Sequence, residues 1–330
     1  ERLALDAIVL RRPANFAWYT GGADSRVDHV SPFGVADVVV TRDAATIVTS
    51  SIEAPRMRAE QTPTFDVVEY TWFEGPDRAL RDVTGGGVIG SDVSLPGAVD
   101  VDSDIAELRR VLDGDAVARL RMVGADASEA LAEAADELVP GMSELDAAAC
   151  LAAACRRRGL SSPVLLAAAD DRIVEHRHPI PVGATIERRA MLVVSAERGG
   201  LYANVTRIVE LDDPDPELRR RQDACDEILR RMREEATRPH ATLADAFDAC
   251  RRFYREAGFP GEETHHHQGG TTGFASREVI ATPRTANLIR VGNAFAWNPS
   301  ITGAKAEETF VLLPSGPEVV AGAHIPVALV

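Results

Sequence analysis

The sequence is poor in lysine, cysteine and aromatic residues, and it contains no long apolar run. Lys305 is the only lysine, although lysine and arginine together number 36. The four cysteines form no CxxC pair and lie in segments predicted to be helical, which favours free thiols in a reducing compartment. No signal-type apolar stretch follows Glu1, and no run approaches the ~20 residues that a membrane span needs. We therefore expect a cytoplasmic protein.

Positive charge is also scarce. The 51 acidic residues outnumber the 36 basic ones, and the net charge is −15. Nucleic acids and anionic membrane surfaces are bound through positive patches, so we expect neither as a partner. The glycine-rich segment 84–90 is not followed by a GK[ST] motif, which predicts a turn before a strand and not a phosphate-binding loop.

A length of 330 residues suggests two domains. In residues 1–110, short β-rich runs alternate with a helical segment, which predicts a small α/β domain. Residues 111–330 combine long helices with strands but lack a strict β-α-β rhythm, which favours an α+β domain with an antiparallel sheet. The helices are expected at 115–138, 143–158 and 216–235, and the strands at 163–168, 190–195, 201–211, 291–297 and 308–313.

Histidines are the first candidates for chemistry. His178 follows His176 in a Glu-His-Arg-His-Pro segment, and His265, His266 and His267 are consecutive. A solvated polar loop would explain the triplet. The glycines at 269, 270 and 273 favour instead a close backbone approach to another group, and hence a site.

Polar residues also interrupt the predicted strands, namely Ser195, Asn204, Thr206 and Asn298, with Lys305 and Glu307 just before the last strand. Polar groups at the edge of a buried strand need partners, which a structural network or a ligand could supply. The Arg277-Glu278 pair that follows the glycines has two interpretations. It forms a surface ion pair, or Arg277 binds a substrate carboxylate through its guanidinium fork.

The order of these features resembles the M24 "pita-bread" family, which includes creatinase and the aminopeptidases. The matching signals are His-Pro, a strand with a polar residue, Thr-Arg, two long helices, a His/Gly loop, Asn-Pro, and a closing Gly-x-Lys-x-Glu-Glu-Thr. The resemblance implies a pita-bread domain for residues 111–330 and a smaller creatinase-type α/β domain for residues 1–110. It also implies a homodimer.

The resemblance further implies five positions that hold metal ions in the metal-dependent members of that family. In this sequence they fall at Ser195, Asn204, His266 or His267, Asn298 and Glu307. One carboxylate is left, whereas two divalent cations need several anionic oxygens. Lys305 would repel a cation further. We therefore expect no metal and no cofactor.

The leading expectation is a metal-independent, creatinase-like hydrolase that acts on a C–N bond of a small nitrogenous substrate. His178 would be the general acid/base, because histidine titrates near neutrality, and Glu307 and His266 would assist it. The expected substrate-binding residues are His176, Ser195, Asn204, Thr206, His267, Gln268, Arg277, Glu278, Asn298 and Lys305. Two alternatives are an inactive homologue that binds a small molecule or peptide, and a divergent Xaa-Pro aminopeptidase-type metallopeptidase.

Overall fold

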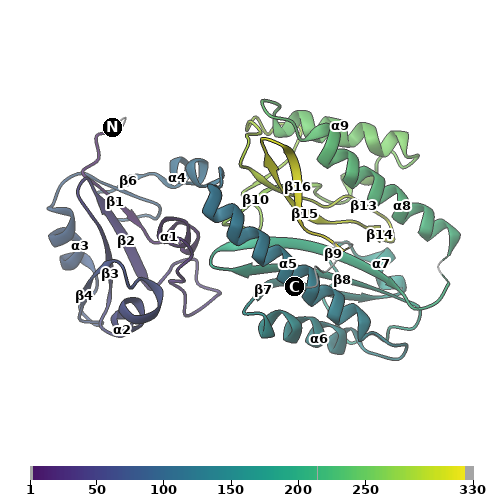
Figure 1. Ribbon diagram of the computed structural model, residues 1–330, viewed down its shortest axis with the longest axis horizontal. Helices are drawn as coiled ribbons and strands as arrows, with labels where there is room; N and C mark the ends of the chain where they lie inside the picture. Colours follow the sequence, from purple (N-terminus) through teal and green to yellow (C-terminus); the bar gives the residue numbers. More distant parts are fainter. Residues whose placement is uncertain (1–2, 214, 324–330) are drawn as a thin grey trace. The chain divides into compact units, whose positions relative to one another are not determined.

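The computed structural model describes residues 3–213 and 215–323. The chain divides into two compact units, Glu1–Arg109 and Arg110–Val330 (Figure 1). Each unit has its own sheets and its own core. None of the helices in the described part of the chain is long and apolar enough to cross a membrane.

The first unit is built on a six-stranded sheet with the order β4-β3-β2-β1-β5-β6. The β1–β2 and β2–β3 pairs are antiparallel, and the other neighbours are parallel. The strands are β1 (Ala7–Leu10), β2 (Ala36–Thr41), β3 (Ala45–Ser50), β4 (Asp66–Tyr70), β5 (Ile89–Ser91) and β6 (Val99–Asp100).

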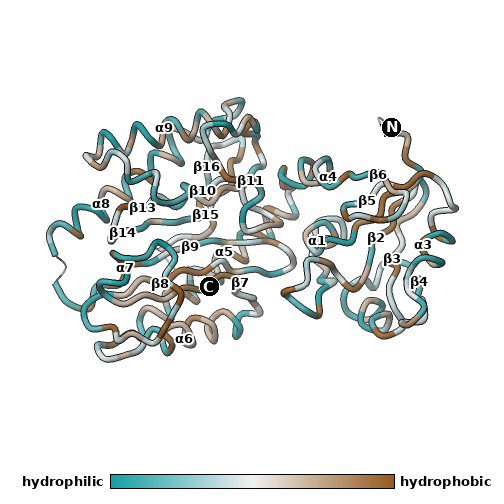
Figure 2. Tube along the Cα trace, turned by 180° about the vertical axis from the view of Figure 1, so that it is seen from behind, coloured by the Kyte–Doolittle hydropathy of each residue, from teal (hydrophilic) through white to brown (hydrophobic). Residues whose placement is uncertain are grey.

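Alternating side chains of this sheet enter two cores. Val38 packs with Phe16 of α1 (Pro13–Thr20) on one face, and Val39 packs with Leu80 of α3 (Asp77–Thr84) on the other. Neighbouring strand residues point to opposite faces, so two apolar layers result, and the central strands are hydrophobic in Figure 2. The first face is also covered by α2 (Ala54–Arg56), the π-helical turn η1 (Met57–Gln61) and α4 (Asp102–Arg109).

The second unit contains two antiparallel sheets. The three-stranded sheet has the order β7-β8-β9, and the five-stranded sheet has the order β11-β10-β12-β15-β16. An isolated bridge between Thr206 and Glu307 connects them. The strands are β7 (Ser161–Ala169), β8 (Arg189–Arg198), β9 (Leu201–Glu210), β10 (Gly269–Thr272), β11 (Val279–Ile280), β12 (Ala294–Trp297), β15 (Glu308–Leu313) and β16 (Gly316–Ala321), with a small β13 (Ser300–Ile301) and β14 (Ala304–Lys305) pair beside them.

Long helices flank these sheets, as Figure 1 shows. They are α5 (Gly114–Asp136), α6 (Glu144–Arg157), α8 (Pro216–Arg231) and α9 (Leu243–Glu256). Helices α5 and α6 lie against the three-stranded sheet, while α8 and α9 share a core with β12 and β15 that includes Phe253 and Phe310. The side chains of Ser143 and Thr242 cap the N-termini of α6 and α9. The two units confirm the expected fold class, a pita-bread domain and a smaller α/β domain.

Some elements differ from the sequence prediction. The third long helix ends at Arg231 and continues as a π-helical turn, η2 (Met232–Ala236). Strand β12 begins at Ala294, because Gly292 has a positive φ of 91° and turns the chain. The short helices α7 (Asp171–Glu175) and η3 (Glu262–Thr264) and strand β10 were not predicted.

Candidate active site

A cavity of about 360 Å³ opens between the two sheets of the second unit. One wall is apolar and is formed by Val164, Leu166, Ile180, Val193 and Val194. The polar side brings together eight of the residues that the sequence singled out. They are His178, Ser195, Asn204, His267, Arg277, Asn298, Lys305 and Glu307.

The glycines after the histidine triplet have a structural explanation. A Cβ atom on Gly269 would lie 2.0 Å from the carbonyl oxygen of Ala296, and one on Gly270 would lie 2.0 Å from that of Val279. Glycine therefore lets β10 fit between β12 and β11. The close backbone approach inferred from the sequence is made by Gly269 and Gly270 to the neighbouring strands.

Neutral side chains form a hydrogen-bonded network at the first two carried-over metal positions. Ser195 and Asn204 are paired across β8 and β9. The Ser276 hydroxyl donates to Asn204 Oδ1 at 3.0 Å and lies 2.9 Å from Ser195 Oγ. Asn204 Nδ2 donates to Thr272 Oγ1 at 3.2 Å. The polar atoms of this pair are thus already engaged with other neutral groups.

Glu307 is the buried carboxylate of the cavity. Its Oε1 accepts a bond from Arg277 at 2.7 Å, and its Oε2 accepts one from Thr206 at 2.7 Å. Lys305 Nζ lies 3.3 Å from the same Oε2. Burial opposes ionisation, but Lys305 and Arg277 outweigh it and lower the pKa of Glu307 to about 2. Two cations therefore share one anion, and this part of the site carries a net charge of about +1.

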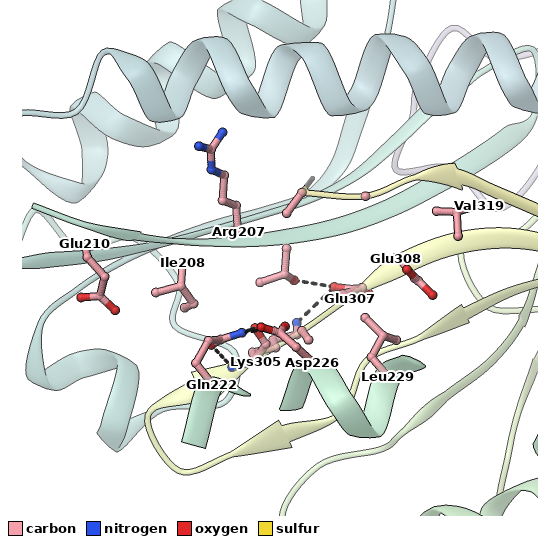
Figure 3. Close-up of a pocket in the computed structure, with 14 residues that line it drawn as sticks. Arg207, Ile208, Glu210, Gln222, Asp226, Leu229, Lys305, Glu307, Glu308 and Val319 are labelled. Carbon is pink, nitrogen blue, oxygen red and sulfur yellow. Dashed lines mark hydrogen bonds and ion pairs between the residues drawn. The ribbon is translucent and has the colours of Figure 1, made fainter. Parts of the chain in front are cut away.

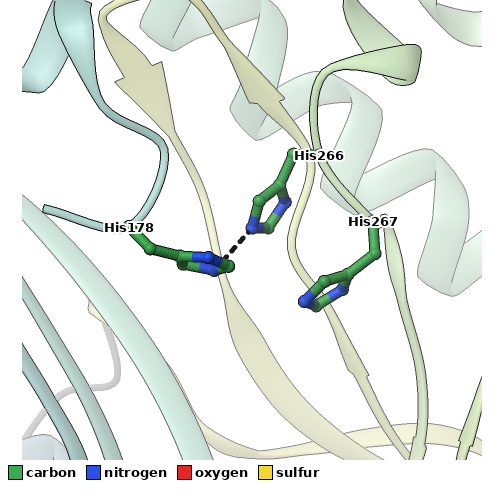
Figure 4. A group of neighbouring side chains, drawn as sticks. All are labelled: His178, His266 and His267. Carbon is green, nitrogen blue, oxygen red and sulfur yellow. Dashed lines mark hydrogen bonds between the residues drawn. The ribbon is translucent and has the colours of Figure 1, made fainter.

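Three imidazoles converge at the edge of the cavity (Figure 4). His178 Nε2 and His266 Nε2 are 2.9 Å apart, and the His266 and His267 rings stack with centroids 4.4 Å apart. Burial, and then Lys305, lower the pKa of His178 and bring that of His266 to about 2. Burial and then Arg277 lower the pKa of His267 to about 4. All three rings are therefore neutral at pH 7.

Two sets of contacts hold the histidine-bearing segments in place. Arg177, next to His178, donates to Glu262 at 2.5 Å and to Thr302 at 2.9 Å. Gln268, next to His267, accepts a bond from the buried Tyr254 hydroxyl at 2.7 Å. These contacts tie the loop after α7 and the loop before β10 to the β13–β14 region. The backbone segments that carry His178, His266 and His267 are therefore held in place.

The remaining predicted residues lie outside the cavity lining. Thr206 does not line this cavity but donates a hydrogen bond to Glu307 Oε2. Gln268 is only 1% exposed and is bonded to Tyr254. His176 is exposed and lies 3.7 Å from Glu175, while Glu278 follows Arg277 away from the lining. The sequence reasoning missed Ser276, which connects Ser195 to Asn204. The sequence feature that could have pointed to Ser276 is its position directly before Arg277.

Comparison with known families agrees with this geometry. The model of metallopeptidase family M24 matches residues 118–324, and that of the creatinase/prolidase N-terminal domain matches residues 1–123. The chain therefore belongs to metallopeptidase family M24. No curated protein matches it.

Solved structures share the fold over nearly the whole chain. A prolidase from Pyrococcus furiosus is 17% identical with a TM-score of 0.77, and 97% of each chain is covered. An X-Pro aminopeptidase from Thermotoga maritima is 19% identical with a TM-score of 0.79, covering 97% of this chain and 94% of the other. An Xaa-Pro dipeptidase from Bacillus anthracis is 17% identical with a TM-score of 0.78, covering 100% and 96%. At this identity the likeness establishes the fold alone.

Proposed function

We propose that this protein hydrolyses an amide C–N bond of a short peptide-like substrate, with His178 as the proton-transfer group and without a metal pair. The supporting observation is a neutral His178 that lines the same cavity as two cations, the buried Lys305 and the half-buried Arg277. A neutral imidazole can take a proton from water and return it to the leaving nitrogen. The cationic side of the cavity would meet the charge that develops on the substrate.

The donor set supports a reaction without two divalent cations. Ser195 and Asn204 are neutral and are bonded to Ser276. Both oxygens of Glu307 are engaged by protein donors, and two cations already neutralise it. A metal pair would have to displace these contacts and would face like charge at short range. We infer that Lys305 and Arg277 supply the positive charge that the metal ions would otherwise supply.

The proposed substrates are Xaa-Pro dipeptides, which the names of the structurally similar prolidase and Xaa-Pro dipeptidase suggest. The apolar wall around Leu166, Ile180 and Val193 suits the ring of a prolyl residue. Carboxylate binding by the Arg277 guanidinium was one of the two interpretations of the sequence, and we propose it for the carboxylate of the substrate. Apolar and anionic parts of one small ligand would thus have separate contacts.

A metallopeptidase with altered ligands is the second candidate, because the ligand atoms of His178, His266 and His267 lie within 4.8 Å of one another. Three imidazoles and an open position form some catalytic zinc sites. Two observations weigh against it. The Gly269 N–H donates to His267 Nδ1 at 3.3 Å, which places the proton of the neutral ring on Nε2. His266 Nδ1 has no partner in the described part of the chain, whereas metal-bound histidines usually donate from the second nitrogen.

The experiment is a release assay with a panel of Xaa-Pro dipeptides. We expect the wild-type protein to release proline and His178→Ala to be slower by about 10²–10⁴-fold. His265→Ala is the matched control, because His265 belongs to the same triplet as His266 but is exposed and does not line the cavity. Equal rates for His178→Ala and the wild type would refute the assignment. Absence of release from every dipeptide would favour the binding-only homologue.

A further inference from the structure

Lys305 occupies an unusual position between two cavities. It ends β14, it is only 5% exposed, and it lines both the candidate active site and a second cavity of about 520 Å³ that also contacts Glu307. Figure 3 shows Lys305 beside Glu307 and Gln222 among the residues that line the second cavity. A buried lysine that faces open space on either side can reach a bound molecule.

The backbone of Lys305 is fixed on both sides. Its N–H donates to Gln222 Oε1 at 3.3 Å, and its carbonyl accepts from Gln222 Nε2 at 3.1 Å. Pairing with Ser300 in the β13–β14 hairpin adds a second anchor. The backbone position from which the Lys305 side chain extends is therefore fixed. The reach of the ammonium group is set by the side chain alone.

The ammonium group has unused hydrogen-bonding capacity. A lysine has three N–H donors. Within residues 3–213 and 215–323, Glu307 is the one ion-pair partner recorded for Lys305, and its Oε2 is shared with Thr206. Glu307 is also held by Arg277 at its other oxygen, so the carboxylate cannot turn to satisfy more of the ammonium. Donors of Lys305 remain available on the cavity side.

We propose that Lys305 is a catalytic residue whose ammonium group binds the oxygen of the scissile carbonyl. This inference rests on the proposed hydrolysis. Water adds to the carbonyl carbon and loses its proton to His178, while the electron pair of the C=O bond moves to the oxygen facing Lys305. The pair then returns, the C–N bond breaks, and His178 passes the proton to the leaving nitrogen. A fixed cation aimed at a developing negative charge is the usual source of such stabilisation.

The kinetic test uses two substitutions at this position. Lys305→Met removes the charge and leaves an unbranched side chain that is one atom shorter. We expect it to lower kcat by about 10²–10³-fold with little change in KM. Lys305→Arg should recover part of the loss, because it restores the charge with a different shape. Arg233→Met is the control, since it removes a half-buried cation from the neighbouring Glu308 and leaves the cavity intact. A wild-type kcat for Lys305→Met would overturn the proposal.

A labelling experiment tests the contact without relying on turnover. Lys305 is the only lysine, so acetylation of its peptide, measured by mass spectrometry, reports on this amine alone. The probe is a phosphinate analogue of an Xaa-Pro dipeptide, whose tetrahedral P–O⁻ mimics the oxyanion. We expect it to protect Lys305 in the wild type and in His178→Ala. Equal labelling with and without the phosphinate would overturn the role of Lys305. If His178→Ala hydrolyses the dipeptides at the wild-type rate while the phosphinate still protects Lys305 from acetylation, only the proposed proton transfer by His178 is refuted.

Discussion

His178 Nε2 lies 2.9 Å from His266 Nε2, so one of these two neutral rings must donate its proton to the other. His178 is exposed on its loop, whereas His266 is only 9% exposed and belongs to the loop before β10. The buried ring thus fixes the orientation of the exposed one. We regard His266 as a positioning residue for His178, where the sequence analysis had placed it among the catalytic groups.

Replacing His266 should therefore impair catalysis through His178. His266→Phe keeps a ring but removes the hydrogen-bonding nitrogen, and we expect kcat to fall by about 10- to 100-fold because the base is misplaced. KM should change little, and the acid limb of the pH–rate profile should stay in place, because burial and Lys305, which lower the pKa of His178, both remain. His265→Ala serves again as the control. An unchanged kcat, or a loss that appears only as a higher KM, would rule out the positioning role.

The pH dependence of kcat/KM follows from the lowered pKa of His178. Burial, and then Lys305, disfavour its protonated form, so the folded pKa lies below 6.5. The ring must be neutral to accept a proton. Activity should be constant from pH 6.5 through neutrality and, on the acid side, should fall about ten-fold per pH unit only below the folded pKa. Lys305→Met, if its residual rate is measurable, should move this limb upward. A limb above pH 6.5 in the wild type would contradict the electrostatics described here.

Glu307 should matter for stability as well as for activity. Glu307→Gln leaves the buried Lys305 and the half-buried Arg277 without their anion, and we expect a loss of about 3–5 kcal/mol in the free energy of unfolding. Glu234→Gln removes an exposed carboxylate of the Arg230 pair and should cost less than about 1 kcal/mol. Urea denaturation of both variants compares the two effects. Similar losses in the two variants would mean that the ion pairs of Glu307 contribute no more to stability than an exposed pair does.

Gly269 provides a test of the fold that does not involve chemistry. Gly269→Ala places a Cβ atom 2.0 Å from the Ala296 carbonyl oxygen, which forces β10 away from β12. Gly316→Ala also has a positive φ, of 117°, but meets nothing within 4 Å. We expect the first variant to lose about 1–3 kcal/mol more than the second. Equal melting temperatures would show that the strand can move without cost.

Much of the fold could be predicted from the sequence because its signals are local. The caps Ser143 and Thr242 mark where α6 and α9 begin, and the apolar runs of β8 and β9 are long enough to identify. Strand β10 could not be predicted, because Gly-Gly-Thr-Thr has low intrinsic strand preference. It forms a strand only because β11 and β12 hold it on both sides.

The candidate site could be predicted in part for a related reason. Ser195 and Asn204 lie within apolar strands and Glu307 directly precedes one, so these polar residues stand out from their apolar neighbours in the sequence. Ser276 was not, since its role depends on a loop that brings it to Asn204 from 72 positions away in the chain. His176 was assigned to substrate binding because of its neighbour His178, but it lies outside the cavity lining. Sequence proximity does not fix side-chain direction in a loop.

The homodimer and the cytoplasmic location stay predictions. Light scattering on the purified protein would give the mass of the assembly directly. A mass of one chain would refute the dimer, and a mass of two chains would support it. Fractionation of the native cells would test the location in the same way.

Metal content measured alongside activity is the most direct test of the central claim. The purified protein would be dialysed against a chelator, analysed for Mn, Zn, Fe and Co, and assayed on the same Xaa-Pro dipeptides. The account predicts far less than one ion per chain and an undiminished rate. Two ions per chain, with activity that disappears on chelation and returns when metal is added back, would contradict it.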